Sequence, residues 1–324
     1  MINLAVIGTN WITEKFVQAA HETGCFNLKA VYSRQLERAQ AFAQPFKVET
    51  LYDDLMSLAK AKQIDAVYIA SPNSLHCEQA IVMMEHGKHV VCEKPLASTP
   101  DEVIKMMEVA RANHVVLLEA YKTQFLPNFR ALDTHLGKIG KVHKAHFNYC
   151  QYSSRYQKYL DGLNPNTFNP AFSNGSIMDI GFYCIAAAVF LFGGPQKVLA
   201  SAHLLPSGVD GHGTAILSYP DFDLLISHSK VTNSHLASEI QGEKGSIIIE
   251  HIAECDRLTI QYSNGEVEHI ELPQAENSMY YEAEAFAQRI QHKGPYTSQH
   301  SLTVANLLSE IRKQTGVHFP ADAV

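Results

Sequence analysis

A lysine at the end of a short apolar strand is the residue of this chain best suited to acid–base chemistry. In the stretch HVVCEKPLAS, residues 89–98, the strand pattern runs directly into Glu93, Lys94 and Pro95. An ammonium group held there can donate a proton and stabilise an oxygen that gains negative charge. Pro95 restricts Lys94 to extended backbone angles and makes a cis peptide bond possible.

A second apolar strand ends in a similar polar cluster, in the stretch YIASPNSLH at 68–76. In open α/β sheets, ligands bind outside the carboxyl ends of the strands, so two such ends indicate one binding edge. Taken singly, each end is equally compatible with the start of a capped helix. Together they predict cofactor contacts from Ser71, Pro72, Asn73, His76, Glu93 and Lys94.

Alternating strand and helix patterns position these strand ends. Over the first 120 residues the apolar runs lack clean period-two alternation, which suits strands covered on both faces. They lie at 2–8, 28–33, 47–50, 66–70, 89–93 and 115–120, with helical patterns at 14–23, 36–46, 52–61, 75–86 and 100–113. Thr99, Pro100 and Glu102 form a capping signature, and Gly87 stands where a helix C-cap glycine belongs. Residues 1–120 are therefore predicted to form an α/β domain with a Rossmann-type, doubly wound parallel sheet.

The pattern changes after residue 121. Longer strand patterns occupy 141–152, 197–205, 213–231, 237–251 and 257–273, and helical patterns occupy 181–192, 279–291 and 302–314. Turn signals such as Pro220-Asp221 and Asn264-Gly265 separate the strands, the second being typical of a hairpin. We expect residues 121–324 to form an α+β domain built on a large, mostly antiparallel sheet.

The turn after the first strand, AVIGTNWIT, stands where a phosphate-binding loop would lie. Such a loop uses glycines for a tight turn, for close approach to the pyrophosphate and for helix–strand packing. Only Gly8 is a glycine here, and Asn10 and Thr13 occupy the second and third glycine positions. Asparagine tolerates unusual backbone angles, so cofactor binding remains compatible with this turn, as does an ordinary βα turn. The predicted contacts are Gly8, Thr9, Asn10, Trp11 and Ile12.

The end of the second strand bears on which dinucleotide binds. NAD-binding domains usually place a carboxylate there to bind the ribose 2′-hydroxyl. This chain instead has Ser33 and Arg34 at the strand end and Arg38 one helical turn later. A hydroxyl and guanidinium groups can bind a 2′-phosphate, although both arginines are also compatible with solvated helix residues. We predict NADP as the cofactor, with NAD as the alternative.

Composition excludes several classes of protein. The 324 residues are 46% hydrophobic and 18% charged, and the formal charge of −7 argues against nucleic-acid binding. The six cysteines are far apart and form no CxxC pair, which indicates reduced thiols in a cytoplasm. The chain enters a strand at once, leaving no room for a signal peptide, and its longest apolar run, CIAAAVFLFG, is about half of what a bilayer needs. We expect a cytoplasmic protein that binds neither nucleic acid nor a membrane.

Other catalytic chemistries find little support. Seventeen histidines suggest a metal, but the sequence has no HExxH motif and no cysteine-rich ligand set. No GxSxG elbow supports a serine nucleophile. We predict no metal site. Arg155 and Tyr156, in the polar stretch SSRYQKYLDG, could line a substrate pocket, and an exposed loop is an equally good interpretation.

Several long stretches resemble one family, that of glucose–fructose oxidoreductase, inositol dehydrogenase and the rhizopine-catabolism proteins (Gfo/Idh/MocA). They are SPNSLHCEQAIVMMEHGKHVVCEKPLA, EAYKTQFLP, GSIMDIGFYCI, EIQGEKGSIIIE and MYYEAEAFAQRI, in order along nearly the whole chain. The resemblance implies a Rossmann domain followed by a domain whose open sheet face often forms homodimers or homotetramers.

The resemblance also implies roles for individual residues. Lys94 matches the catalytic lysine of the family, and Asp179 and Tyr183 match the first and last positions of its Asp-x-Gly-x-His or Tyr motif. Tyrosine at the last position is similar to the subgroup of dihydrodiol dehydrogenases and glucose–fructose oxidoreductase. Two positions depart from the family: the glycine turn is degenerate, and Gln124 replaces an arginine expected to contact substrate.

These residues suit the reduction of a carbonyl group, which needs a hydride and a proton. Lys94 can supply the proton, Tyr183 a second hydrogen bond, and Asp179, four residues before Tyr183, can orient substrate or lysine. The leading hypothesis is an NADP-dependent oxidoreductase acting on a sugar, polyol, diol or dicarbonyl. The alternatives are a nucleotide-binding regulator without redox turnover and a redox-assisted glycosidase, both of which occur in this family.

Overall fold

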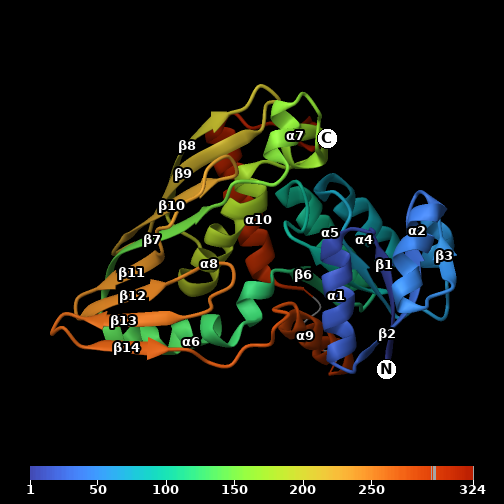
Figure 1. Ribbon diagram of the computed structural model, residues 1–324, viewed down its shortest axis with the longest axis horizontal. Helices are drawn as coiled ribbons and strands as arrows, with labels where there is room; N and C mark the ends of the chain where they lie inside the picture. Colours follow the sequence, from blue (N-terminus) through green and yellow to red (C-terminus); the bar gives the residue numbers. More distant parts are fainter. Residues whose placement is uncertain (293, 295–296, 324) are drawn as a thin grey trace. The chain divides into compact units, whose positions relative to one another are not determined.

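The chain forms two compact units in a computed structural model that describes residues 1–292, 294 and 297–323 (Figure 1). The first unit comprises Met1–Ala120 and Ala275–Leu302, and the second comprises Tyr121–Gln274 and Thr303–Val324. The first stretch of the first unit ends at Ala120, and the described residues of Ala275–Leu302 also belong to this unit.

Six parallel strands form the sheet of the first unit, in the order β3-β2-β1-β4-β5-β6. Their bounds are β1 (Ile2–Ile7), β2 (Phe26–Tyr32), β3 (Thr50–Tyr52), β4 (Ala66–Ile69), β5 (His89–Glu93) and β6 (Leu117–Ala120). The strand order reverses between β1 and β4, which is where doubly wound sheets bind ligands. The predicted Rossmann-type sheet is confirmed.

The helices of the first unit are α1 (Trp11–Glu22), α2 (Leu36–Ala43), α3 (Leu55–Ala59), α4 (His76–Glu85), α5 (Pro100–Ala112) and α9 (Tyr280–Gln291). Helix α9 packs against α1, which explains why residues far along the chain belong to this unit. The rings of Phe26 and Phe286 stack 6.0 Å apart, and Asn277 Nδ2 donates to the Lys15 carbonyl oxygen at 2.8 Å.

The predicted helix ends near the binding edge are confirmed. The Thr99 hydroxyl accepts from the Glu102 amide at 3.2 Å, and the Glu102 carboxylate accepts from the Thr99 amide at 3.3 Å. This capping box sets the start of α5 directly after the Lys94 loop. Gly87 follows α4 with φ of +76°, the left-handed conformation of a C-cap glycine.

The segment between β2 and β4 departs from the sequence-based expectation. Helix α2 ends at Ala43 because Pro45 lacks an amide hydrogen, and a 3-10 turn, η1 (Gln44–Phe46), follows. Lys47 then adopts a left-handed conformation with φ of 55°. Strand β3 therefore begins only at residue 50, and the helix expected at 52–61 shortens to α3, with the Asp54 carboxylate capping it.

Eight strands form the sheet of the second unit, in the order β14-β13-β12-β11-β7-β10-β9-β8. Their bounds are β7 (Val142–Cys150), β8 (Lys197–Leu204), β9 (Asp210–Ser218), β10 (Asp223–Ser229), β11 (Ser238–Gly242), β12 (Gly245–Ile249), β13 (Leu258–Tyr262) and β14 (Val267–Ile270). Only the pairing of β7 with β10 is parallel among these strands, so the predicted large, mostly antiparallel sheet is confirmed. Gly265, with φ of +90°, makes the predicted hairpin between β13 and β14.

The helices of the second unit are α6 (Pro127–Leu136), α7 (Tyr156–Leu160), the π-helix η7 (Ile177–Gly181) and α8 (Phe182–Phe192). Helix α10 (Gln299–Thr315) spans the division between the units, and its residues from 303 onward belong to the second. Short 3-10 turns are η2 (Asn73–Leu75) in the first unit and η3 (Lys122–Phe125), η4 (Gly137–Ile139), η5 (Asn166–Phe168), η6 (Pro170–Phe172) and η8 (Pro320–Ala323) in the second. Sequence patterns missed α6, although Pro127 at its first position is a typical start signal.

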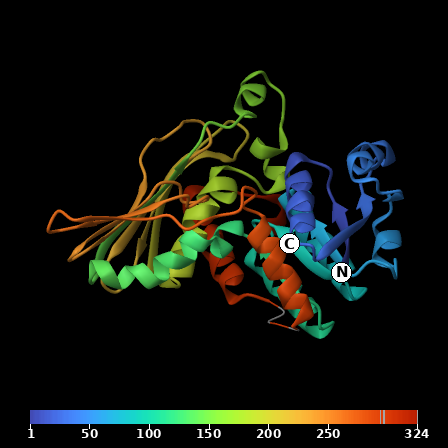
Figure 2. The same cartoon turned by 60° about the horizontal axis from the view of Figure 1, so that its bottom comes forward.

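Helices α6 and α8 lie on one face of this sheet, and Figures 1 and 2 show no described helix of the second unit over its other face. Side-chain burial alternates accordingly along β9: His212, Thr214 and Ile216 are exposed, whereas Ala215 and Leu217 are buried. Period-two alternation of this kind is typical of a sheet covered on one face.

Candidate functional site

The glycine turn after β1 has the backbone that a close-approach site needs. Gly8 has φ of +109°, and a Cβ there would come within 2.7 Å of the Ala70 carbonyl oxygen. Asn10 is exposed, and its side-chain oxygen accepts from the amides of Ile12 and Thr13 at 3.0 and 3.2 Å. Asn10 thus acts as the N-cap of α1, and Thr13 is buried beneath it. Cofactor contacts from Gly8, Thr9, Asn10, Trp11 and Ile12 stay a prediction.

A cationic pocket lies at the end of β2. Ser33, Arg34, Gln35 and Arg38 line a cavity of about 360 Å³, and no carboxylate is among these lining residues. The Ser33 hydroxyl accepts from the Gln35 amide at 3.3 Å, which fixes the turn that carries it. A hydroxyl beside two guanidinium groups fits a phosphate ester, because Arg donates several hydrogen bonds to phosphate oxygens. The residues present therefore fit the 2′-phosphate of NADP.

Strand β4 and the first residue of α4 hold the segment around Lys94 from both sides. The Lys94–Pro95 peptide is cis. Before the lysine, Tyr68 donates to the Glu93 carboxylate at 2.6 Å, and Glu93 in turn accepts from the Lys94 amide at 3.3 Å. After it, the Pro95 carbonyl oxygen lies 3.0 Å from His76 Nδ1. His76 is fully buried, so the structure assigns its ring to the loops and not to an exposed binding surface.

Glu119, near the end of β6, is a second support of this loop that the sequence-based reasoning missed. Its Oε1 accepts from the Leu96 amide at 2.8 Å. Burial raises the pKa of Glu119 to about 7, against the lowering effect of hydrogen bonds from Ser301 and Leu96. The signal that could have found it is a single carboxylate inside the apolar run VVLLEA, since buried carboxylates usually have a specific partner.

Asp179 lies in the π-helix η7 of the second unit, where it forms an ion pair with Lys230. The Lys230 side chain is 3% exposed, whereas that of Asp179 is 34% exposed. The sequence predicts that Asp179 orients substrate or Lys94, and the structure adds Lys230 as its partner. Single π-turns inserted at the start of an α-helix are frequent at functional sites.

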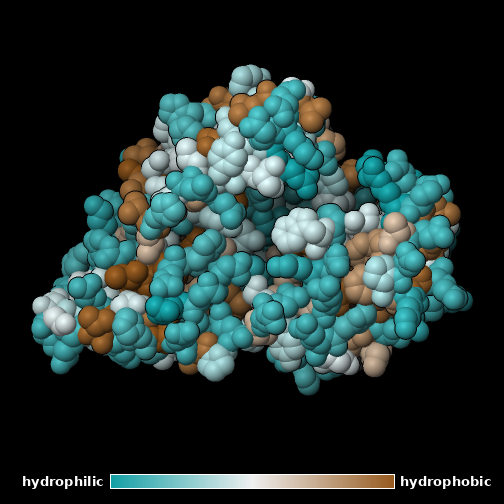
Figure 3. All heavy atoms as spheres, viewed as in Figure 1, coloured by the Kyte–Doolittle hydropathy of each residue, from teal (hydrophilic) through white to brown (hydrophobic). Residues whose placement is uncertain are grey.

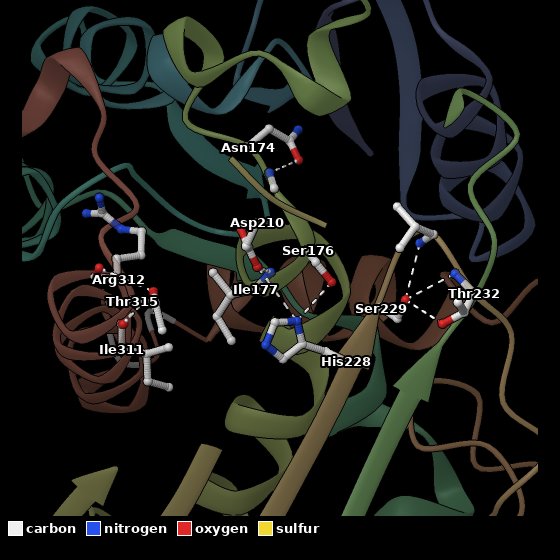
Figure 4. A network of polar contacts seen from close by, with 12 residues as sticks. Asn174, Ser176, Ile177, Asp210, His228, Ser229, Thr232, Ile311, Arg312 and Thr315 are labelled. Atoms are coloured by element: carbon white, nitrogen blue, oxygen red, sulfur yellow. Dashed lines mark hydrogen bonds and ion pairs between the residues drawn. The ribbon is translucent and has the colours of Figure 1, made fainter. Parts of the chain in front are cut away.

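A buried polar network lies beneath this π-turn (Figure 4). Asp210 Oδ2 accepts from the Ile177 amide at 2.7 Å, and His228 Nδ1 is 2.8 Å from the Ser176 hydroxyl. Burial raises the pKa of Asp210 to about 6 and lowers the pKa of His228 to about 3. His228 Nδ1 and Asp210 Oδ2 lie 3.7 Å apart. The two side chains form no ion pair near neutral pH, because the imidazole is neutral there.

Tyr183, at the start of α8, belongs to a row of aromatic rings. Its ring centroid is 5.6 Å from that of Tyr149 and 5.9 Å from that of Tyr121. Tyr149 also contacts His251 at 4.8 Å, and burial, followed by the nearby Asp179 and Glu254, raises the pKa of Tyr149. Asp179 and Tyr183 thus both lie near Tyr149, which supports the expectation that they share one site.

The residues predicted to bind substrate lie in different settings. Gln124 is half-buried in η3, next to Lys122, which pairs with Glu254 at 2.5 Å. Arg155 is exposed, and Tyr156 begins the short helix α7, with its ring 5.5 Å from Phe168. Leu160 and Leu163, which follow, are 56% and 58% exposed, and Figure 3 shows apolar atoms gathered over the position of α7.

The described residues bear on two questions, whether side chains are arranged to hold a metal ion and whether a stretch could cross a membrane. Among them, no group of three or more His, Cys, Asp or Glu side chains is arranged to hold a metal ion. One stretch, Pro170–Phe192, is long and apolar enough to cross a membrane by length and composition, and 72% of its most apolar window is buried inside the protein. A buried core helix passes the same test.

Comparison with known proteins identifies the family. Residues 2–121 match the Gfo/Idh/MocA oxidoreductase family with its NAD-binding Rossmann fold, and residues 135–248 match the Gfo/Idh/MocA C-terminal domain. The chain belongs to the Gfo/Idh/MocA oxidoreductase family. The resemblance inferred from the sequence motifs is therefore confirmed, and the protein is an NAD(P)-dependent oxidoreductase.

Relatives within this family match along nearly the whole chain. The chain is 56% identical over 329 residues to the uncharacterized oxidoreductase YgjR of Escherichia coli (strain K12), covering 100% of this chain and 99% of YgjR. It is 49% identical over 326 residues to scyllo-inositol 2-dehydrogenase (NADP(+)) IolU of Bacillus subtilis (strain 168), covering 99% of each. Human trans-1,2-dihydrobenzene-1,2-diol dehydrogenase is 30% identical over 314 residues, 90% of each chain.

Solved structures of the family share the fold. KijD10, a 3-ketoreductase from Actinomadura kijaniata in complex with NADP and TDP-benzene, superposes with a TM-score of 0.88 at 23% identity, covering 98% of this chain and 99% of KijD10. Levoglucosan dehydrogenase in complex with NADH and levoglucosan gives a TM-score of 0.84 at 21% identity, covering 97% and 96%. At this identity the likeness extends to the fold alone.

Proposed function

We propose that the protein transfers a hydride between NADP and a cyclic polyol or sugar, with Lys94 as the proton donor and acceptor. The structural observation that carries this proposal is the support of Lys94 at the carboxyl end of β5, where Glu93 and Pro95 are both held by buried partners. The 49% identity to a scyllo-inositol 2-dehydrogenase that uses NADP(+) supports the choice of substrate class.

The proposed preference for NADP rests on the pocket of Ser33, Arg34 and Arg38. A carboxylate at this strand end would repel a 2′-phosphate, whereas two guanidinium groups attract it. NADP, when bound, supplies or accepts the hydride at nicotinamide C4. The further contacts that we propose are those predicted for the glycine turn at 8–12 and for the strand-end residues Ser71, Pro72, Asn73 and Glu93. His76 supports this edge from beneath, since it is fully buried.

Lys94 is proposed to move the proton that the reaction requires. In the direction of oxidation the neutral amine removes the hydroxyl proton, and in the direction of reduction the ammonium returns a proton to the same oxygen. The ammonium form also stabilises negative charge on that oxygen. Lysine suits this role because its pKa moves readily on burial or beside another cation, whereas arginine stays protonated.

Asp179 and Tyr183 are proposed to bind the reacting hydroxyl group and its neighbour. The phenol of Tyr183 can donate a hydrogen bond to the reacting oxygen, and the carboxylate of Asp179 can accept one from an adjacent hydroxyl. Their shared proximity to Tyr149 supports a joint role. One group that donates a hydrogen bond and one that accepts a hydrogen bond can together bind hydroxyl groups on two adjacent carbon atoms.

The proposed substrate is uncharged. In the second unit the cations near this group are engaged with carboxylates: Lys230 with Asp179 and Lys122 with Glu254. Gln124 presents a neutral amide at the position where relatives are expected to carry arginine. A carboxylate or phosphate group bound beside Asp179 and Tyr183 would instead need a lysine or arginine there that is not paired with a carboxylate. We propose Gln124, Arg155 and Tyr156 as further substrate contacts, with the exposed Arg155 donating hydrogen bonds to substrate hydroxyl groups.

The test is the oxidation of scyllo-inositol, myo-inositol, D-glucose and D-xylose with NADP⁺ and with NAD⁺, followed as absorbance of the reduced cofactor. We expect turnover of a cyclic polyol with a higher kcat/KM for NADP⁺. The Lys94→Ala variant should lose about 100-fold or more of kcat, because general acid–base catalysis supplies that factor. Lys105→Ala, at an exposed position of α5 in the same unit, is the matched control.

Two outcomes would support the alternatives and contradict the proposal. NADPH binding without turnover of any polyol or of its ketone, together with equal affinity in Lys94→Ala, would favour a regulatory protein. Sugar release from a glycoside without net change in cofactor absorbance would favour a redox-assisted glycosidase. Inositol ketones should therefore be tested with NADPH in parallel, and glycosides by sugar release.

A homo-oligomeric, cytoplasmic state is part of the proposal. The sheet face without described helices, which carries Leu199 at 49% and Ile216 at 38% exposure, supports an association between copies through that face. The six cysteines are all free, as expected in a reducing compartment. Light scattering at several concentrations tests the oligomeric state.

A further inference from the structure

A buried lysine supports Asp179 from the sheet of the second unit. Lys230 directly follows β10, and its side chain is 3% exposed. Its ammonium group forms an ion pair with Asp179 and lies 5.4 Å from the centre of the Phe168 ring. A buried ammonium group is stable only where a carboxylate or an aromatic face compensates its lost hydration.

The position of Lys230 is determined by the strand that precedes it. Leu224, Ile226 and His228 occupy the buried face of β10, and Lys230 continues that period-two series. The backbone is held on both sides: the Lys230 amide donates to the Gly211 carbonyl oxygen, and its carbonyl accepts from the Ser153 amide, both at 2.9 Å. The backbone from which the Lys230 side chain extends is therefore fixed by hydrogen bonds on both sides.

A second buried acid connects Lys230 to the same π-turn. Asp210 accepts from the Ile177 amide, at the first residue of η7, and the positive charge of Lys230 acts on the Asp210 carboxyl as well. Lys230 consequently attracts one carboxylate within the turn, Asp179, and a second carboxyl that binds the start of the turn. Lys230 and Tyr149 act on Asp179 from the strands packed against the turn, and Asp210 and His228 contact the residues Ile177 and Ser176 that begin it.

We propose that Lys230 is a positioning residue, which keeps Asp179 ionised and oriented so that it accepts a hydrogen bond from a substrate hydroxyl and takes no proton. This inference rests on the proposed function of Asp179 as a substrate contact. It assigns the proton transfer to Lys94 alone, and it explains why a lysine is buried beside the π-turn.

The kinetic test compares Lys230→Met, which keeps the stem and removes the charge, with Lys230→Arg, which keeps the charge. In Lys230→Met we expect kcat/KM for the polyol to fall about 100-fold, since a small displacement of a positioning group has effects of this size. For reduction of the corresponding ketone with NADPH, in which Lys94 acts as the ammonium and sets the alkaline limb, the acid limb of the kcat/KM profile should move up by about 1–3 pH units, because Asp179 loses its ion pair. Lys230→Arg should keep most of the wild-type kcat/KM and the wild-type position of the acid limb. The Kd for NADPH should be unchanged in both variants.

Two controls keep the result interpretable. Lys313→Met removes an exposed lysine of helix α10 in the second unit and should leave kcat/KM and the pH profile unchanged. If Lys230→Met does not fold, the double variant Lys230→Met/Asp179→Asn removes both charges, and its kcat/KM should equal that of Asp179→Asn. A folded Lys230→Met with the wild-type pH profile and kcat/KM would overturn the inference.

An independent readout needs no substrate. The Asp179 carboxyl carbon, assigned by its loss in Asp179→Asn, can be titrated by NMR in the wild type and in Lys230→Met. We expect its midpoint to rise in the variant, and an unchanged midpoint would contradict the inference. An inactive wild type with a shifted midpoint would refute the proposed function while leaving the ion-pair role of Lys230 in place.

Discussion

His76 lies between two backbone carbonyl oxygens, with Nδ1 3.0 Å from that of Pro95 and Nε2 2.9 Å from that of Ser71. The ring thereby joins the loops that follow β4 and β5, next to Lys94. Burial lowers the pKa of His76, whereas the two carbonyl contacts raise it. In the neutral ring one nitrogen donates a hydrogen bond, and the second contact becomes a donated bond only when the ring is protonated.

Removing this ring should loosen the Lys94 loop. We expect His76→Ala to lower the free energy of unfolding by roughly 2–4 kcal/mol, because it removes the hydrogen bond to one of the two carbonyl oxygens and creates a cavity. The KM for NADP⁺ should rise as well, since both loops border the proposed cofactor site. Urea unfolding and initial-rate kinetics measure the two effects. The exposed His318→Ala is the control, and equal stability of both variants would refute the role.

Charge and proton transfer can be separated at residue 94. Lys94→Arg keeps a cation but cannot release its proton, because the guanidinium pKa lies above about 12. We expect Lys94→Arg to lose about 100-fold or more of kcat while NADPH binding, measured by cofactor fluorescence, stays within about twofold of wild type. Near-wild-type kcat in Lys94→Arg would show that electrostatic stabilisation alone suffices.

Cofactor preference should be reversible at the end of β2. Ser33→Asp places a carboxylate beside Arg34 and Arg38, where it would repel a 2′-phosphate and could bind a ribose hydroxyl instead. We expect the ratio of kcat/KM for NADP⁺ over NAD⁺ to fall about 100-fold, the equivalent of a few kcal/mol of repulsion. Arg34→Ala should reduce the same ratio less. The exposed Arg130→Ala should not change it, and an unaltered ratio in Ser33→Asp would place the phosphate elsewhere.

Glu119 should make stability depend on pH. Its pKa is raised from 4.5 to about 7 in the folded state. A raised folded-state pKa means that the stabilisation is complete below about pH 4.5 and is lost as the pH rises through about 7. Glu119→Gln keeps an acceptor for the Leu96 amide and cannot ionise. The stability of wild type relative to this variant should therefore fall by up to about 3 kcal/mol between pH 4.5 and 8.

Urea unfolding at several pH values measures this difference. Glu108→Gln, at an exposed site on α5, is the matched control for the loss of one carboxylate in the same unit. A constant stability difference between wild type and Glu119→Gln across the pH range would show that Glu119 ionises no differently in the folded and unfolded chains.

The sequence was sufficient where short-range physics decides the structure. The βαβ series, the capping box at Thr99, the left-handed Gly87 and the hairpin at Gly265 all follow from local patterns. It misplaced β3 by three residues because the left-handed Lys47 after Pro45 delays the strand, and a left-handed lysine has no clear sequence signal.

Partners distant in sequence were beyond such reasoning. Helix α9 has an ordinary amphipathic pattern, and nothing in that pattern specifies that it packs against α1 of the first unit. The π-turn at 177–181 likewise depends on Asp210, which binds its first amide from 33 residues away. The prediction that Asp179 and Tyr183 lie on one helix face used regular α-helical spacing. In the structure Asp179 lies in the π-helix and Tyr183 in the α-helix that follows it.

By itself the sequence determined which residues stand at the strand ends. The change from apolar residues to Glu93, Lys94 and Pro95 marks the end of the buried strand, and it can be read from neighbouring residues alone. Only the tertiary structure decided that Lys230 pairs with Asp179, 51 residues earlier, and that His76 joins two loops. Electrostatic and hydrogen-bond partners are selected by distance in space, which a linear pattern does not contain.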